Sequence, residues 1–148
     1  MSQGLRDVAI RVKQEHLDQI AKHGEKTYPY ECCGFLLGTR QGETSILGEA
    51  HAAENERQES RETRYLITPE QYKRADDYAR SRGLGVIGYY HSHPDHPAAP
   101  SGYDLDHSCW PGESYIIVAV EKGKAVALNS FTKPDYTRFE HEEIVIED

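Results

Sequence analysis

Long hydrophobic runs are missing from this chain of 148 residues. A membrane-spanning helix needs about 20 consecutive apolar residues, and no stretch approaches that length. The first residues also lack the charged-then-apolar pattern of a secretory signal. We therefore expect a cytoplasmic protein without a membrane partner. The chain is long enough to bury a hydrophobic core, and it shows no repeats or linkers, which predicts one domain over residues 1–148.

Cysteine and clustered positive charge are also scarce. The three cysteines are Cys32, Cys33 and Cys109, and an odd count favours reduced thiols over a disulfide framework. No C-x-x-C pair exists, which argues against a cysteine-based zinc knuckle or a thioredoxin-like site, so we expect small buried residues. The net charge is −8, from 17 basic and 25 acidic residues. Without a dense basic cluster to bind phosphates, nucleic acid is not an expected partner.

Histidine, by contrast, is abundant: the chain has eight, and His91-Ser92-His93-Pro94 directly follows the apolar run 86–90. Side chains alternate along a strand, so His91 and His93 are expected on one face. Asp104 falls in the first turn of a predicted helix, which the proline-rich loop between them can fold back over the strand end. Catalytic zinc sites commonly have three protein ligands and one open position. The pattern therefore predicts one Zn²⁺ held by His91, His93 and Asp104.

A hydrolytic zinc site also needs a group that moves the proton of water to a leaving amine. Glu31 is the candidate, because it opens a buried strand that can pair beside 86–90. Ser101 has two interpretations: the N-cap of an S-x-x-D capping box, or a hydroxyl that stabilises an oxyanion. A metal-binding Asp104 is not expected to complete a reciprocal capping box. This favours the second interpretation, although capping by Ser101 alone is compatible with it.

Hydrophobic periodicity predicts a mixed sheet flanked by two main helices, an α/β or α+β arrangement. Strands are expected at 7–10, 32–38, 44–50, 65–67, 86–90, 115–120, 124–131 and 136–146, and helices at 12–23, 68–82 and 101–109. Several polar groups are expected at the surface: His51, the loop 51–63, His96, Asp106, His107 and the acidic end at 142–148. Trp110 is expected in the core or in the wall of a substrate groove.

The motif H-S-H-P-x6-S-x-x-D at 91–104, with Glu31 before C-G-F-L-L-G, resembles the JAMM (MPN+) metalloproteases. The resemblance implies a cytidine deaminase-like fold and one Zn²⁺ on His91, His93 and Asp104. It also implies that Glu31 is the general acid/base and that Ser101 stabilises the tetrahedral intermediate.

Members of that family cut peptide or isopeptide bonds after the C-terminal Gly-Gly of ubiquitin or ubiquitin-like proteins. The segment after Asp104 has no room for the insertion of the eukaryotic deubiquitinases. The chain is therefore more similar to the prokaryotic stand-alone members. These act on ubiquitin-like sulfur-carrier proteins and release cysteine or another adduct.

Two other functions of the same fold stay open. A non-catalytic scaffold that recognises ubiquitin-like proteins usually lacks some of the metal ligands, and none is missing here. A zinc deaminase is disfavoured because the H-x-E and P-C-x-x-C elements are absent. The zincin motif H-E-x-x-H is absent as well.

Overall fold

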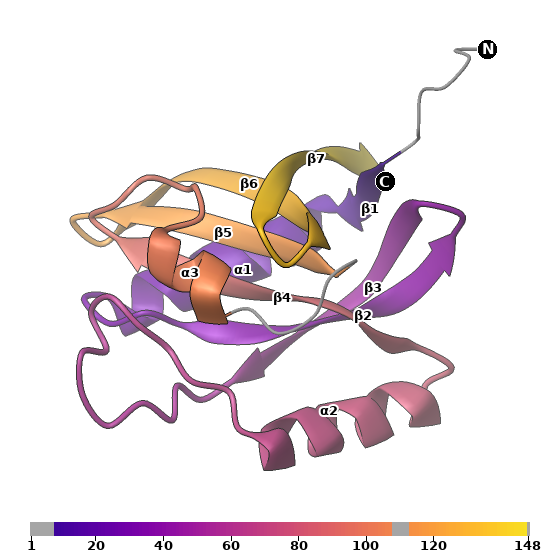
Figure 1. Ribbon diagram of the computed structural model, residues 1–148, viewed down its shortest axis with the longest axis horizontal. Helices are drawn as coiled ribbons and strands as arrows, with labels where there is room; N and C mark the ends of the chain where they lie inside the picture. Colours follow the sequence, from indigo (N-terminus) through magenta and orange to yellow (C-terminus); the bar gives the residue numbers. More distant parts are fainter. Residues whose placement is uncertain (1–7, 108–112, 148) are drawn as a thin grey trace.

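The computed structural model describes residues 8–107 and 113–147. These residues form strands and helices in an order that begins with a strand and ends with a long hairpin (Figure 1). The elements are β1 (Ala9–Lys13), α1 (Gln14–Thr27), β2 (Cys33–Gln41), β3 (Thr44–Ala53), α2 (Pro69–Ser81), β4 (Gly85–Pro94), α3 (Gly102–His107), β5 (Ser114–Glu121), β6 (Lys124–Asp135) and β7 (Arg138–Glu147).

The strands form one mixed sheet in the order β1-β3-β2-β4-β5-β6-β7, and its two ends meet. Strand β1 closes the sheet, because it pairs in parallel with both β3 and β7. Strand β4 lies in the middle, antiparallel to β2 and parallel to β5. The predicted mixed sheet with flanking helices is confirmed.

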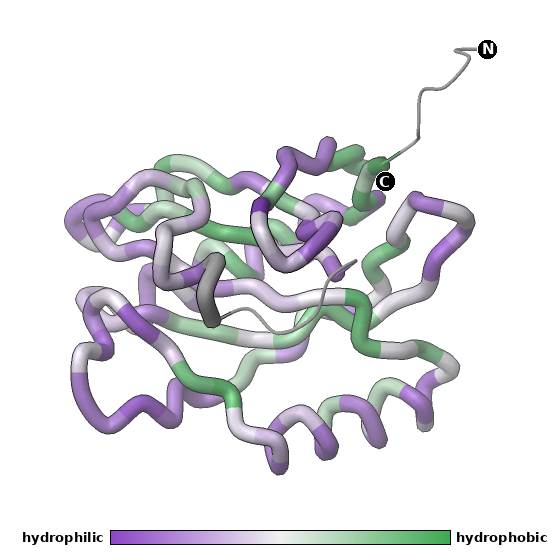
Figure 2. The backbone as a smooth tube through the Cα atoms, viewed as in Figure 1, coloured by the Kyte–Doolittle hydropathy of each residue, from purple (hydrophilic) through white to green (hydrophobic). Residues whose placement is uncertain are grey.

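Helices α1 and α2 pack against opposite faces of the sheet. Ile20 of α1 belongs to a buried cluster with Leu36 of β2. Ala79 of α2 belongs to a second cluster with Phe35, the neighbour of Leu36. The alternation of side chains along a strand therefore supplies both faces of β2 with apolar contacts. Figure 2 shows the apolar residues concentrated along the central strands. No helix in the described ranges is both long and apolar enough to cross a membrane.

Helix α1 extends to Thr27, beyond the predicted end near Gly24. Gly24 does not terminate the helix because it lies against the sheet. A Cβ at this position would come within 2.9 Å of Val120 Cγ2. Glycine thus permits close packing of α1 on β5, and the chain leaves the helix at Tyr28-Pro29.

Strand β4 is longer than predicted and includes both histidines. Its register with β5 joins His91 to Ile117 and His93 to Ala119. The strand does not end at Tyr90, because β5 supplies hydrogen-bonding partners as far as Pro94.

The segment 54–68 connects β3 to α2 and is called the β3–α2 loop below. It is hydrophilic over most of its length (Figure 2), and the predicted strand at 65–67 is wrong. Asn55 organises the loop: its Oδ1 accepts a hydrogen bond from the Leu66 N–H at 3.0 Å, and its Nδ2 donates to the Glu31 and Arg64 carbonyls. The Asn55 side chain thus supplies the backbone hydrogen bonds that a neighbouring strand would otherwise provide. The helix predicted over 68–82 is confirmed as α2, and Thr68 is its N-cap.

The last two strands differ from prediction in one informative respect. Glu142 was expected at a solvated strand end, but it is 1% exposed. It pairs in register with Ser130, whose Oγ donates to Glu142 Oε1 at 2.7 Å, and Ser114 Oγ donates to Oε2 at 3.1 Å. Pro134 does not end β6 either; the ladder shifts register between Thr132 and Asp135 and then continues.

Candidate metal centre

Strand β4 presents His91 and His93 on the same face. Their Nε2 atoms lie 3.1 Å apart, and the side chains are nearly inaccessible to solvent. Ser92 points the other way, where its Oγ accepts a hydrogen bond from the Cys32 N–H at 2.8 Å. Because Cys33 pairs in register with His91, Glu31, two residues before Cys33, lies at the same end of the sheet.

Asp104, in the first turn of α3, completes the cluster. Its Oδ1 lies 3.3 Å from His91 Nε2, and its Oδ2 lies 3.1 Å from His93 Nε2. Oδ2 also accepts a hydrogen bond from the Ser101 N–H at 2.8 Å, while the Asp104 N–H donates to Ser101 Oγ at 3.0 Å. The reciprocal capping box is therefore complete. A metal-binding Asp104 was not expected to complete this box, but its two oxygens offer enough lone pairs to cap the helix and to face the two imidazoles.

These three side chains fit a zinc ion. The two Nε2 atoms lie 3.1 Å apart, and each has one oxygen of Asp104 nearby, Oδ1 at 3.3 Å from His91 and Oδ2 at 3.1 Å from His93. A tetrahedral zinc site with bonds of about 2.0–2.1 Å has neighbouring ligands about 3.3 Å apart. His93 Nδ1 lies 2.8 Å from the Pro97 carbonyl oxygen. This contact requires the Nδ1–H tautomer and turns the lone pair of Nε2 towards the cluster.

The charge states also suit a metal centre. Burial lowers the pKa of His91, which favours the neutral imidazole that binds metals. Burial alone would raise the pKa of Asp104, but hydrogen bonds from His91 and His93 hold it well below its usual range. At neutral pH the cluster therefore offers a carboxylate and a neutral His91 imidazole to a metal ion.

Glu31 is buried beside this cluster, at 3% exposure. Its N–H donates to the Arg61 carbonyl at 2.7 Å and its own carbonyl accepts from Asn55, so the β3–α2 loop fixes its backbone. Burial, and then the charge of Asp104, raise the pKa of Glu31 to about 9. Without a metal ion, the Glu31 carboxyl therefore keeps its proton at neutral pH.

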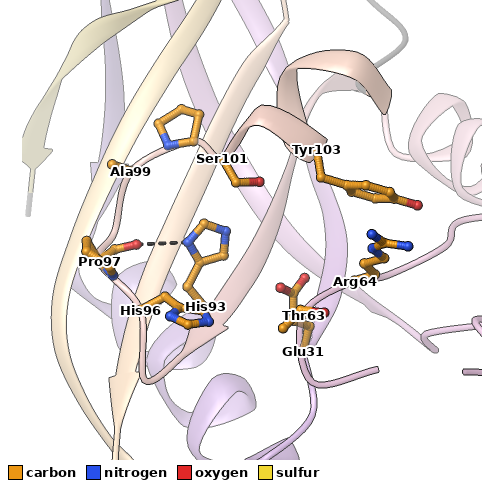
Figure 3. A pocket seen from close by; sticks show the side chains of 10 residues that line it. Glu31, Thr63, Arg64, His93, His96, Pro97, Ala99, Ser101 and Tyr103 are labelled. Carbon is orange, nitrogen blue, oxygen red and sulfur yellow. Dashed lines mark hydrogen bonds between the residues drawn. The ribbon is translucent and has the colours of Figure 1, made fainter. Parts of the chain in front are cut away.

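A cleft of about 450 Å³ opens beside the cluster. Figure 3 shows Glu31, His93 and Ser101 around it, with Ser101 across from Glu31. Its lining comes from the β3–α2 loop, the turn after β4 and α3: Glu31, Thr63, Arg64, His93, His96, Pro97, Ala99, Pro100, Ser101 and Tyr103. Two imidazoles, a carboxylate, a buried acid and an exposed serine therefore share one site.

Some residues of the site had no signal in the sequence. The Tyr65 ring stacks on His91 with centroids 4.7 Å apart and planes 27° apart, and Arg64 and Tyr103 line the cleft. They come from a loop and a helix whose packing depends on distant contacts, such as that of Asn55 with Glu31.

The other predicted residues have mixed outcomes. His96 is exposed as predicted, and it also lines the cleft. His51 is half-buried, because its ring stacks on Tyr78 at 4.9 Å. Cys32 and Cys33 are buried free thiols, as predicted. Four predictions, for Cys109, Trp110 and the side chains of Asp106 and His107, lie outside the described residues.

A family model described as prokaryotic homologues of the JAB domain matches residues 13–132. The chain belongs to this family, which confirms the JAMM resemblance. A desampylase of Haloferax volcanii is 35% identical over 89 residues, covering 60% of this chain and 62% of that protein. A probable TtuB-protein conjugate cleaving protease of Thermus thermophilus is 29% identical over 126 residues, covering 84% and 80%. A solved structure from Salinibacter ruber is 44% identical, with a TM-score of 0.74 and coverage of 93% and 92%.

Proposed function

We propose that this protein is a zinc-dependent peptidase or isopeptidase that hydrolyses the bond after the C-terminal Gly-Gly of a ubiquitin-like sulfur-carrier protein and releases cysteine or another adduct. The observation that carries the proposal is the meeting of the His-His-Asp cluster, the buried Glu31 and the exposed Ser101 at one cleft. The name of the Thermus relative specifies cleavage of a protein conjugate, which supports hydrolysis of a bond between a carrier protein and the group attached to it.

His91, His93 and Asp104 would hold the zinc ion. When bound, zinc supplies a Lewis acid that polarises the scissile carbonyl and lowers the pKa of water to about 7. Glu31 takes the proton of the attacking water on a carboxylate oxygen and delivers it to the leaving nitrogen. Burial raises the pKa of Glu31, which favours its role as proton donor, and the positive charge of a bound zinc ion would favour the carboxylate that first accepts the proton.

Ser101 combines its two predicted roles. Its Oγ accepts the hydrogen bond from the Asp104 N–H, but its O–H has no acceptor within the described part of the chain. That hydroxyl hydrogen remains available to donate to an oxyanion that develops at the scissile carbonyl. A Gly-Gly tail suits the cleft, because only glycine lets an extended backbone pass so close to the site.

The test is hydrolysis of a ubiquitin-like carrier that carries one cysteine after its Gly-Gly. The wild type should release the cysteine, a chelator should stop the reaction, and added zinc should restore it. Replacing Glu31 with glutamine should reduce turnover by about 10²–10⁴-fold, whereas Glu70→Gln, on the exposed face of α2, should have no effect. Undiminished cleavage by the Glu31 variant would overturn the mechanism. Carrier binding with neither zinc nor hydrolysis would favour a non-catalytic scaffold.

A further inference from the structure

Two arginines of the β3–α2 loop meet one tyrosine of α3 at the edge of the cleft. The Arg64 guanidinium lies 4.3 Å from the centroid of the Tyr103 ring, and that of Arg57 lies at 5.9 Å. Arg57 Nη1 also donates a hydrogen bond to Tyr103 Oη at 3.0 Å. All three side chains are half-buried. The ring therefore holds the two cations in place and partly removes them from water, which strengthens their attraction to an anion.

Neither arginine has a carboxylate partner within the described ranges. Other arginines do, such as Arg40 with Glu113 and Arg80 with Asp76. The β3–α2 loop itself contains glutamates, yet none lies at ion-pair distance from Arg57 or Arg64. The chain has a net charge of −8, yet the Arg57 and Arg64 guanidinium groups lie side by side without a carboxylate partner. Together they form a site that can stabilise an external anion.

The position of Arg64 indicates which anion. Arg64 lies on the Glu31 side of the cleft, and Ser101 lies across from Glu31 (Figure 3). Glu31 delivers a proton to the leaving nitrogen, so the group attached to that nitrogen lies on the Arg64 side. If the leaving group is a single amino acid, its α-carboxylate is two bonds from that nitrogen. An isopeptide-linked lysine has no carboxylate there, because its nitrogen is at the end of a long alkyl chain.

We propose that Arg64, held on the Tyr103 ring beside Arg57, binds the free α-carboxylate of the amino acid that is released from the Gly-Gly terminus. This contact makes the protein selective for single amino-acid adducts over protein conjugates. A guanidinium matches a carboxylate with two parallel hydrogen bonds, which gives orientation as well as affinity. The inference rests on the proposed hydrolase function and assigns the substrate class within it.

The experiment compares three forms of one ubiquitin-like carrier. The first ends in Gly-Gly-Cys with a free carboxylate, and the second is the same chain as a C-terminal carboxamide. In the third, the Gly-Gly is joined to Nε of a capped lysine. Wild-type protein should show a KM about tenfold lower for the acid than for the carboxamide or the lysine adduct. Arg64→Ala should raise the KM for the acid about tenfold with little change in kcat, because binding in the ground and transition states is lost equally.

The carboxamide provides the internal control for folding. Arg64→Ala should lower the ratio of kcat/KM for the acid to that for the carboxamide about tenfold, whereas Arg74→Ala, which removes an exposed charge on α2, should leave this ratio unchanged. Equal effects of Arg64→Ala on acid and carboxamide would overturn the carboxylate assignment while leaving the hydrolase intact. A wild-type preference for the lysine adduct would also overturn it. No cleavage of any of the three carriers would refute the proposed function itself.

Discussion

Replacing Glu31 with glutamine is expected to stabilise the metal-free protein at neutral pH, although it slows hydrolysis. The Glu31 side chain is 3% exposed, and burial followed by the charge of Asp104 raises its pKa from 4.5 to about 9. A carboxyl group with a higher pKa in the folded state binds its proton more tightly when folded. Its contribution to stability is therefore fully present below pH 4.5 and is lost as the pH rises towards 9.

The size of the effect follows from the two pKa values. At pH 7 the unfolded chain is ionised at this position and the folded protein is not. The gap from pH 4.5 to 7 corresponds to a cost of about 3 kcal/mol, at about 1.36 kcal/mol per pH unit. At pH 5 the cost falls below about 1 kcal/mol. Glutamine has nearly the same shape and no proton to lose, so the variant avoids this cost.

The assay is urea unfolding of wild type and Glu31→Gln in the presence of a chelator, at several pH values between 5 and 8. The variant should be more stable by about 3 kcal/mol at pH 7, and the difference should shrink as the pH falls. The exposed Glu70→Gln variant should follow the wild type throughout. A difference between Glu31→Gln and wild type that stays constant with pH would refute the reasoning, because it would mean that Glu31 does not titrate as a buried carboxyl.

Three further predictions concern the support of the site and of the sheet. Tyr65→Ala should weaken zinc binding about tenfold in a competition titration with a coloured chelator. The reason is that the Tyr65 ring orients His91 by stacking, because His91 Nδ1 has no hydrogen-bond partner in the described part of the chain. Tyr65→Phe keeps the ring and should bind zinc as tightly as the wild type. Ser101→Ala should lower kcat about 100-fold and should lower the free energy of unfolding by about 1 kcal/mol, because the cap of α3 is lost. If stability falls but kcat does not, Ser101 is only a helix cap. Burial raises the pKa of Glu142, so the wild type loses stability relative to Glu142→Gln as the pH rises from 4 to 8. The Tm of Glu142→Gln minus that of the wild type should therefore increase over this range, and a decrease would contradict the prediction.

The local chemistry of the site was predictable because it depends on short spacings. Alternation along a strand places His91 and His93 on one face, and a three-residue spacing places Ser101 against the first turn of α3. The pairing of β2 with β4 also followed from two buried apolar runs. The first two features need only the neighbours of each residue in the chain, and the third needs only the apolar character of both runs.

Other features depend on contacts between distant segments and had no local signal. The parallel pairing of β1 with β7 closes the sheet, and the pairing of Glu142 with Ser130 carries an acidic residue into the interior. Asn55 holds the β3–α2 loop against Glu31 and thereby brings Tyr65 and Arg64 to the site. A polar sequence such as that of this loop predicts exposure, but it does not predict where side-chain hydrogen bonds anchor the backbone.

The central claim is that His91, His93 and Asp104 hold one zinc ion that hydrolysis requires. The most direct test is a titration of zinc into metal-free protein, with bound metal and release of cysteine from the Gly-Gly-Cys carrier measured on the same samples. Activity should rise in proportion to bound zinc and level off at one ion per chain, and Asp104→Ala should lose both. Full activity in the metal-free protein, or in Asp104→Ala, would contradict the claim.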